Sequence, residues 1–225
     1  QARRAASDMA EINGFLMDVL RMSNPYQTAG ELSLSDAVDM AVVQVDKRFA
    51  GRPALSSGVR FALGYSMLSR NQLALAETQL AQALADSRAS LSATALRTLE
   101  IREAIAQLRI AQGRTKEAEA DLLSVLADIE ASGQTANPLY LLVLNNVGQL
   151  YMEQERYAEA RALFSRASQE RPAYEEAWFN LRDCCDELLA AEASIGAGAI
   201  NSGAFDAAAI AAERAKAAAM LASLA

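Results

Sequence analysis

The chain has 225 residues, 52% of them apolar, a net charge of −7 and no histidine. This composition excludes a disordered chain, argues against nucleic acid as the main partner, and removes the commonest general base and metal ligand. Alanine supplies 49 residues whereas Gly and Pro together supply 15, a mixture that favours closely packed helices, and no apolar run approaches the ~20 residues that span a bilayer.

Residues 1–56 are predicted to form two helices ahead of any repeat. Apolar residues recur at helical spacing along the first helix, and the pattern ends near Pro25. A second helix is expected over about 35–49, because Gly51 and Pro53 follow its end. The apolar seam of the first helix either packs on the second helix or pairs with another copy as a dimerising stalk. Its residues are Met9, Ile12, Leu16 and Val19.

The middle of the chain, residues 57–174, repeats one spacing three times. A small residue is followed by Ala, then by a large apolar residue and a smaller one. The copies lie 42 residues apart: Gly64-Ala76-Leu80-Ala83, Ala106-Ala118-Leu122-Val125 and Gly148-Ala160-Phe164-Ala167. Small residues let two helices cross closely, so the spacing predicts three helix hairpins. Their turns are expected at residues 70–72, 112–114 and 155–157.

Residues 175–225 are predicted to form a degenerate fourth hairpin whose second helix is an Ala-rich cap. Trp178 and Leu181 continue the pattern after Pro172, but a loop insertion precedes the last helix, expected over about 205–223. The expected spacing places Ala208, Ala212 and Ala215 in the core register of that helix.

The pattern resembles the tetratricopeptide repeat (TPR) family. The third copy matches its motif at Gly148, Tyr151, Tyr157, Ala160, Phe164, Ala167 and Pro172. The period is longer than the usual ~34 residues and resembles the long-helix variant of the family. The resemblance implies an all-α fold, a right-handed solenoid of antiparallel helix hairpins, and a protein or peptide as partner.

The order of the N-terminal pieces and the repeats is similar to the extracytoplasmic region of bacterial single-pass regulators. The segment that carries the similarity is Phe15-Leu16 followed by Asn24-Pro25. The resemblance implies a periplasmic sensor domain whose parent is anchored by a membrane helix before Gln1 and carries a serine/threonine kinase or a winged-helix domain. The alternative is a structural TPR adaptor in an envelope, secretion or pilus assembly complex, or a cytoplasmic adaptor.

In the TPR family the first helix of each hairpin lines a peptide groove. Register then predicts the groove residues Phe61, Tyr65, Leu68, Glu103, Gln107, Ile110, Leu142, Asn145, Gln149, Met152, Glu176, Phe179 and Asp183. Apolar residues and acids mix there, so a basic or neutral segment would suit the groove best. The competing interpretation is that the apolar members are core residues and the acids are solvated.

The sequence contains no motif for catalysis or for a cofactor. There is no Gly-rich phosphate loop, nucleophile elbow or metal-ligand spacing, so we expect a protein that is not an enzyme and holds neither metal nor cofactor. The adjacent Cys184 and Cys185 cannot form a long-range disulfide within the chain, and they are predicted to be small buried residues. In an oxidising compartment a free thiol could instead link a homodimer.

Overall fold

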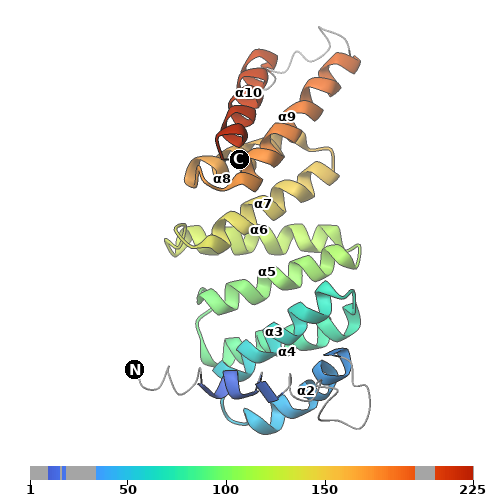
Figure 1. Cartoon of the computed structure of the whole chain (residues 1–225), viewed down its shortest axis with the longest axis vertical. Helices are drawn as coiled ribbons and strands as arrows, with labels where there is room; N and C mark the ends of the chain where they lie inside the picture. Colours follow the sequence, from blue (N-terminus) through green and yellow to red (C-terminus); the bar gives the residue numbers. More distant parts are fainter. Residues whose placement is uncertain (1–9, 16, 19–33, 196–205, 225) are drawn as a thin grey trace. The chain divides into compact units, whose positions relative to one another are not determined.

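The computed structural model describes residues 10–15, 17–18, 34–195 and 206–224, and within these ranges it contains helices and no strand (Figure 1). Residues 10–15 and 17–18 are helical. The following helices are α2 (Leu34–Arg48), α3 (Pro53–Ser69), α4 (Leu73–Ser90), α5 (Leu96–Ala111), α6 (Thr115–Ala131), α7 (Pro138–Glu153), α8 (Tyr157–Glu170), α9 (Glu175–Ile195) and α10 (Ala207–Leu224). The predicted all-α class is confirmed. Met9, Leu16 and Val19 of the predicted seam lie outside the described residues.

The chain divides into two compact units, residues 1–118 and 119–225, and the boundary falls inside α6. In the first unit α3 and α4 form a hairpin, and α5 and α2 both contact α3 (Figure 1). The core of this unit includes Val59, Leu63, Met67 and Leu80. In the second unit α7 and α8 form a hairpin, α9 contacts both helices, and α10 packs along α9.

The N-terminal helix is part of the first core. Phe15 is fully buried, and its ring lies edge-on to that of Phe49 with centroids 5.5 Å apart. Ile12 is partly buried against the same cluster, and Arg52 and Arg48 form ion pairs with acids of this segment. The described part of this segment therefore packs on the following helix, which is one of the two alternatives predicted for the apolar seam.

Two glycines mark the closest approach of the paired helices, as the repeat spacing predicts. A Cβ built on Gly64 would lie 2.8 Å from Cγ of Leu80, and one on Gly148 would lie 2.5 Å from Cε1 of Phe164. Ala76 of the first pair is fully buried, as is its counterpart in the second. The space that a side chain at the glycine would need is therefore filled by the large residue four positions after the alanine, Leu80 or Phe164.

The three hairpin turns share one backbone conformation. Asn71, Gly113 and Glu155, each 42 residues from the next, have φ values of 59°, 75° and 60°. In each turn the following N–H donates to the carbonyl five residues earlier at 2.8–2.9 Å, which is the Schellman ending of a helix. The turns occupy residues 70–72, 112–114 and 154–156, so the third lies one residue before its predicted position.

The predicted register of the last helix is wrong. Ala208, Ala212 and Ala215 are exposed, whereas Ile210 and Ala217 are buried. An alanine-rich helix offers little contrast between its faces, because alanines stand on every side of it. The one large β-branched residue of the helix, Ile210, decides which face turns inward.

Candidate peptide-binding surfaces

In the first unit, the predicted groove residues of α3 form a partly exposed aromatic surface. Tyr65 is 52% exposed, and its ring lies 6.1 Å from that of Phe61, which is half-buried like Leu68. The guanidinium of Arg97 on α5 stacks 5.1 Å from the centroid of Phe61 and pairs with Glu100 at 2.9 Å. Aromatic side chains and arginine are the residues that protein interfaces favour.

The polar groove residues of α5 differ in their accessibility. Glu103 is only 4% exposed, and Gln107 donates to its Oε1 at 3.2 Å. Gln107 and Ile110 are half-buried. The carboxylate of Glu103 therefore holds Gln107 in place, and Gln107 is the more accessible of the two.

In the second unit, several predicted groove residues surround one hollow between α7 and α9. Leu142 and Phe179 are 41% and 48% exposed on these two helices. The hollow has a volume of about 270 Å³. Its lining residues are Gln149, Met152, Glu153, Phe164, Asn180 and Asp183, of which Gln149, Met152 and Asp183 belong to the predicted set.

A chain of hydrogen bonds joins α7 to α9 beside this hollow. Asn145, 1% exposed, donates to Oε1 of Glu176 at 2.9 Å and accepts a bond from Asn180 at 2.6 Å. Tyr174 donates to the other oxygen of Glu176 at 2.9 Å, and burial together with this bond raises the pKa of Tyr174. The two predicted groove residues Asn145 and Glu176 are thus tied to each other.

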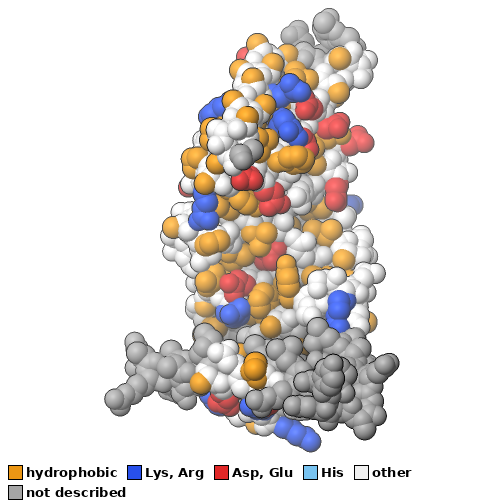
Figure 2. All heavy atoms as spheres, viewed as in Figure 1, with side chains coloured by type: hydrophobic (Ala, Val, Ile, Leu, Met, Phe, Trp, Pro, Cys, Tyr) orange, Lys and Arg blue, Asp and Glu red, His pale blue; other side chains and the backbone are white. Residues whose placement is uncertain are grey.

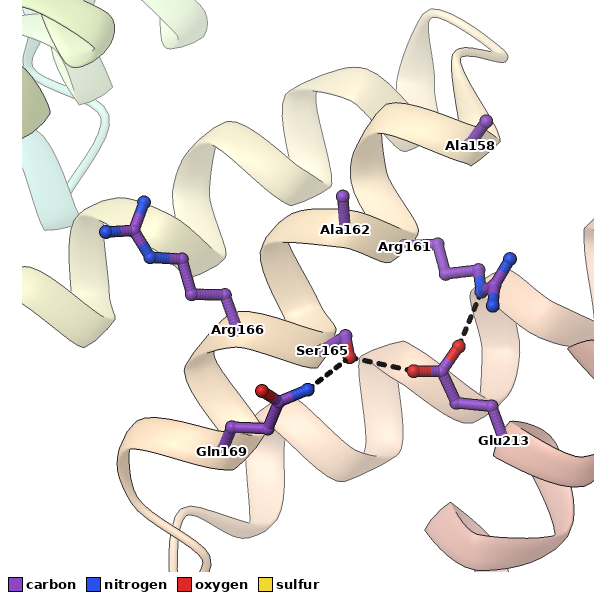
Figure 3. Close-up of a pocket in the computed structure, with 7 residues that line it drawn as sticks. All are labelled: Ala158, Arg161, Ala162, Ser165, Arg166, Gln169 and Glu213. Carbon is purple, nitrogen blue, oxygen red and sulfur yellow. Dashed lines mark hydrogen bonds and ion pairs between the residues drawn. The ribbon is translucent and has the colours of Figure 1, made fainter. Parts of the chain in front are cut away.

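A second hollow, of about 320 Å³, lies between α8 and α10, and the groove prediction does not include its residues (Figure 3). Figure 3 shows Arg161 and Ser165 of α8 facing Glu213 of α10. Arg161 forms an ion pair with Glu213, Ser165 donates to the same carboxylate at 2.7 Å, and Gln169 donates to Ser165 at 3.0 Å. Arg166 points the other way and pairs with Glu130 at 2.8 Å. The acceptors and donors of this hollow are largely engaged with one another, so we assign it to the docking of α10.

The last residue of two hairpin turns, Arg114 and Arg156, is an arginine that clamps neighbouring side chains, and these two arginine clamps lie one repeat period apart. Arg156 forms a bidentate ion pair with Glu159. It also donates to Glu119 on α6 at 2.7 Å and to Gln154. Arg114, 42 residues earlier, contacts Glu117, Gln112 and Glu77 in the same way. The hydrogen bonds from these arginines lower the pKa of Glu117, Glu119 and Glu159.

Both cysteines are fully buried on α9, as predicted. Burial raises the pKa of Cys184 to about 12 and that of Cys185 to about 11. Cys184 donates to the carbonyl of Tyr157 at 3.1 Å. Within the described ranges no cluster of Cys, Asp and Glu is arranged to hold a metal ion. None of the helices in those ranges is long and apolar enough to cross a membrane.

Comparison with known proteins places the fold among TPR-like repeat proteins. No family model matches the chain, and no curated protein matches it. Among solved structures, BtubC (BKLC) from P. vanneervenii has a TM-score of 0.64 at 16% identity, covering 99% of this chain and 91% of its own. A putative kinesin light chain protein of Podosopora anserina with nearly identical TPR-like repeats has a TM-score of 0.50 at 17% identity, covering 73% of this chain and 86% of its own.

The chain therefore has a TPR-like helical repeat fold, in which antiparallel helix hairpins build a solenoid. The fold does not specify a partner, because recognition depends on the surface residues that a chain carries.

Proposed function

We propose that the chain is a protein-binding module that receives a segment of a partner polypeptide on its first-helix faces. The observation that supports this most is the exposure of large apolar side chains at the inner-face positions: Tyr65 on α3, Leu142 on α7 and Phe179 on α9. Figure 2 shows apolar patches interspersed with separate acidic and basic side chains. Such a mixed surface suits an extended or helical peptide that carries apolar anchors and charges.

The biological setting that we propose is the periplasmic sensor region of a bacterial transmembrane receptor, one whose output is a serine/threonine kinase. It rests on the N-terminal resemblance described above. Phe15 packs on Phe49 next to α2, α2 contacts α3, and α3 carries Tyr65. A ligand on α3 would act on the N-terminal helix only if it bound one arrangement of that helix better than another.

The binding proposal is tested by selecting peptides from a displayed random library on the immobilised 225-residue chain and titrating the best one by calorimetry. Replacing Tyr65 or Phe179 by Ser is expected to lower the affinity about tenfold or more, because aromatic residues dominate interface energies. Val43→Ser is the matched control, since Val43 is 67% exposed but lies on α2. Failure to enrich any peptide, or equal binding by all variants, would contradict the proposal.

The receptor setting needs its own test, because peptide binding would suit an adaptor equally well. The parent gene is read upstream of Gln1. A run of about 20 apolar residues preceded by a kinase or winged-helix domain is expected. A lipoprotein signal, or a parent without an output domain, would favour the adaptor.

A further inference from the structure

The hollow between α7 and α9 is rich in hydrogen-bond acceptors. Glu153 is exposed, and its carboxylate contacts no cation among the described residues. Asp183 receives both bonds of its neighbour Arg182 on Oδ1, at 2.8 and 3.1 Å, which leaves Oδ2 for another donor. Arg182 is itself stacked on Phe179, 4.6 Å from the ring centroid. Two carboxylates therefore offer acceptor oxygens to this hollow.

The neighbouring hydrogen bonds fix a third acceptor. The carboxylate of Glu176 can only accept, so the group of Asn145 that faces it must be the NH₂. The remaining oxygen of Asn145 then accepts, and the group of Asn180 that meets it must also be an NH₂. The amide oxygen of Asn180 is left as an acceptor on a residue that lines the hollow.

The net negative charge of the chain is concentrated in the second unit, which contains this hollow. Residues 119–225 contain 16 Asp and Glu but 7 Lys and Arg, a net charge of −9, whereas residues 1–118 have a net charge of +2. In Figure 2 several acidic side chains gather at the right-hand edge of the part built by α7 and α9. A field of one sign attracts a partner segment of the opposite sign.

We propose that this hollow holds a lysine side chain of a basic partner segment. The ammonium of lysine has three donors and no acceptor, which matches the carboxylates of Glu153 and Asp183 and the amide oxygen of Asn180. Half-buried Met152, with Phe164 behind it, provides apolar contact for the aliphatic stem. This inference rests on the proposed peptide-binding function and names the chemistry of its partner.

The test uses the full 225-residue chain, fluorescently labelled, on arrays of random dodecapeptides that differ in one fixed central residue. The fixed residues are lysine, Nε-acetyl-lysine, norleucine, arginine and glutamate. Acetylation and norleucine keep the stem but remove the charge. We expect the lysine arrays to bind best, with a loss of about tenfold for the two neutral analogues and more for glutamate.

The same arrays are then read with variants of the chain. The double variant Glu153→Gln and Asp183→Asn keeps shape and hydrogen bonding but removes both charges, and it should abolish the preference for lysine over norleucine. Glu170→Gln is the matched control, because it removes an exposed carboxylate of the same unit outside the hollow. Circular dichroism checks that each variant is folded.

The outcomes separate this inference from the function on which it rests. If peptides bind without a preference for lysine, or the double variant keeps that preference, the lysine site is refuted and the binding module stands. A preference for arginine over lysine also refutes it. If no array binds, whatever its central residue, both proposals fail.

Discussion

The ring of Phe164 occupies the place that a side chain at position 148 would need, because a Cβ on Gly148 would lie 2.5 Å from Cε1 and 2.7 Å from Cζ. The same relationship joins Gly64 to Leu80 in the first hairpin. Phe164 also stands behind the hollow that Met152 and Asp183 line. The glycine therefore sets both the crossing of α7 and α8 and the base of a candidate binding surface.

Replacing Gly148 by Ala should destabilise the protein by about 1–3 kcal/mol, because a fully buried aromatic ring has little room to withdraw. Chemical denaturation measures the change in the free energy of unfolding. Gly58→Ala is the matched control: Gly58 lies inside α3 with nothing within 4 Å of its Cβ position. That control should stabilise by about 0.5–1 kcal/mol, since glycine is a poor helix residue. Equal stability of the two variants would show that the close approach of Gly148 to Phe164 does not penalise a larger residue at position 148.

The hairpins were predictable from the sequence because close helix crossings accept few residue types. Gly64 and Gly148 stand at those crossings, and a Cβ at either position would force the facing side chain, Leu80 or Phe164, to move. The positive φ of the turns was less visible at Glu155, because glutamate rarely adopts it, whereas Gly113 and Asn71 are residue types that favour it. The register of α10 was predicted wrongly because a pattern based on side-chain size cannot distinguish the exposed Ala215 from the buried Ala217.

The candidate site was predictable only in part. Helical register placed Gln149 and Met152 on the correct helix, but Asn180 and Glu153 of the same hollow were missed, because their roles depend on how α7 meets α9. The arginine clamp did leave a signal. A Gln, an Arg two residues later and a Glu three residues after that recur at 42-residue spacing in residues 112–117 and 154–159.

The arginine clamp predicts a dependence of stability on pH. The hydrogen bond from Arg156 lowers the pKa of Glu119 below its ordinary value of 4.5, so the native chain takes up this proton less readily than the unfolded chain. The stability that the pair supplies is present above about pH 4.5 and is lost as the pH falls through the lowered pKa. Glu119→Gln should therefore lose less stability than the wild type between pH 7 and pH 3, measured by urea denaturation at each pH. A parallel pH profile in the variant would argue against a contribution from this pair.

The two cysteines should be unreactive in the folded chain. Cys184 and Cys185 are fully buried, and burial raises the pKa values of their thiols to about 12 and about 11, so almost no thiolate is present at pH 8. A thiol reagent such as dithionitrobenzoate should release chromophore only after denaturant is added, for both thiols together. Rapid modification of the native chain, or a disulfide-linked dimer under non-reducing electrophoresis, would contradict the buried placement and revive the thiol-linked homodimer.

The last helix should be the least firmly held helix of the second unit. The buried residues of α10 are Ile210 and Ala217, and three polar contacts add to its packing on α9. Glu213 pairs with Arg161, Arg214 pairs with Asp186, and Lys216 lies 5.5 Å from the ring centroid of Trp178. Exposed pairs contribute up to about 1 kcal/mol each and are screened by salt.

Glu213→Gln weakens the pair with Arg161 while keeping the size of the side chain, and it should speed hydrogen exchange in α10 by up to about fivefold with little change in α7. Raising the salt concentration should bring the wild type closer to the variant. Hydrogen exchange read by mass spectrometry resolves the two helices separately. The matched control is Glu170→Gln on α8, which removes a carboxylate without touching α10. If α10 and α7 exchange at the same rate in every variant and at every salt concentration, the helix opens only with the whole unit, and its attachment is not electrostatic.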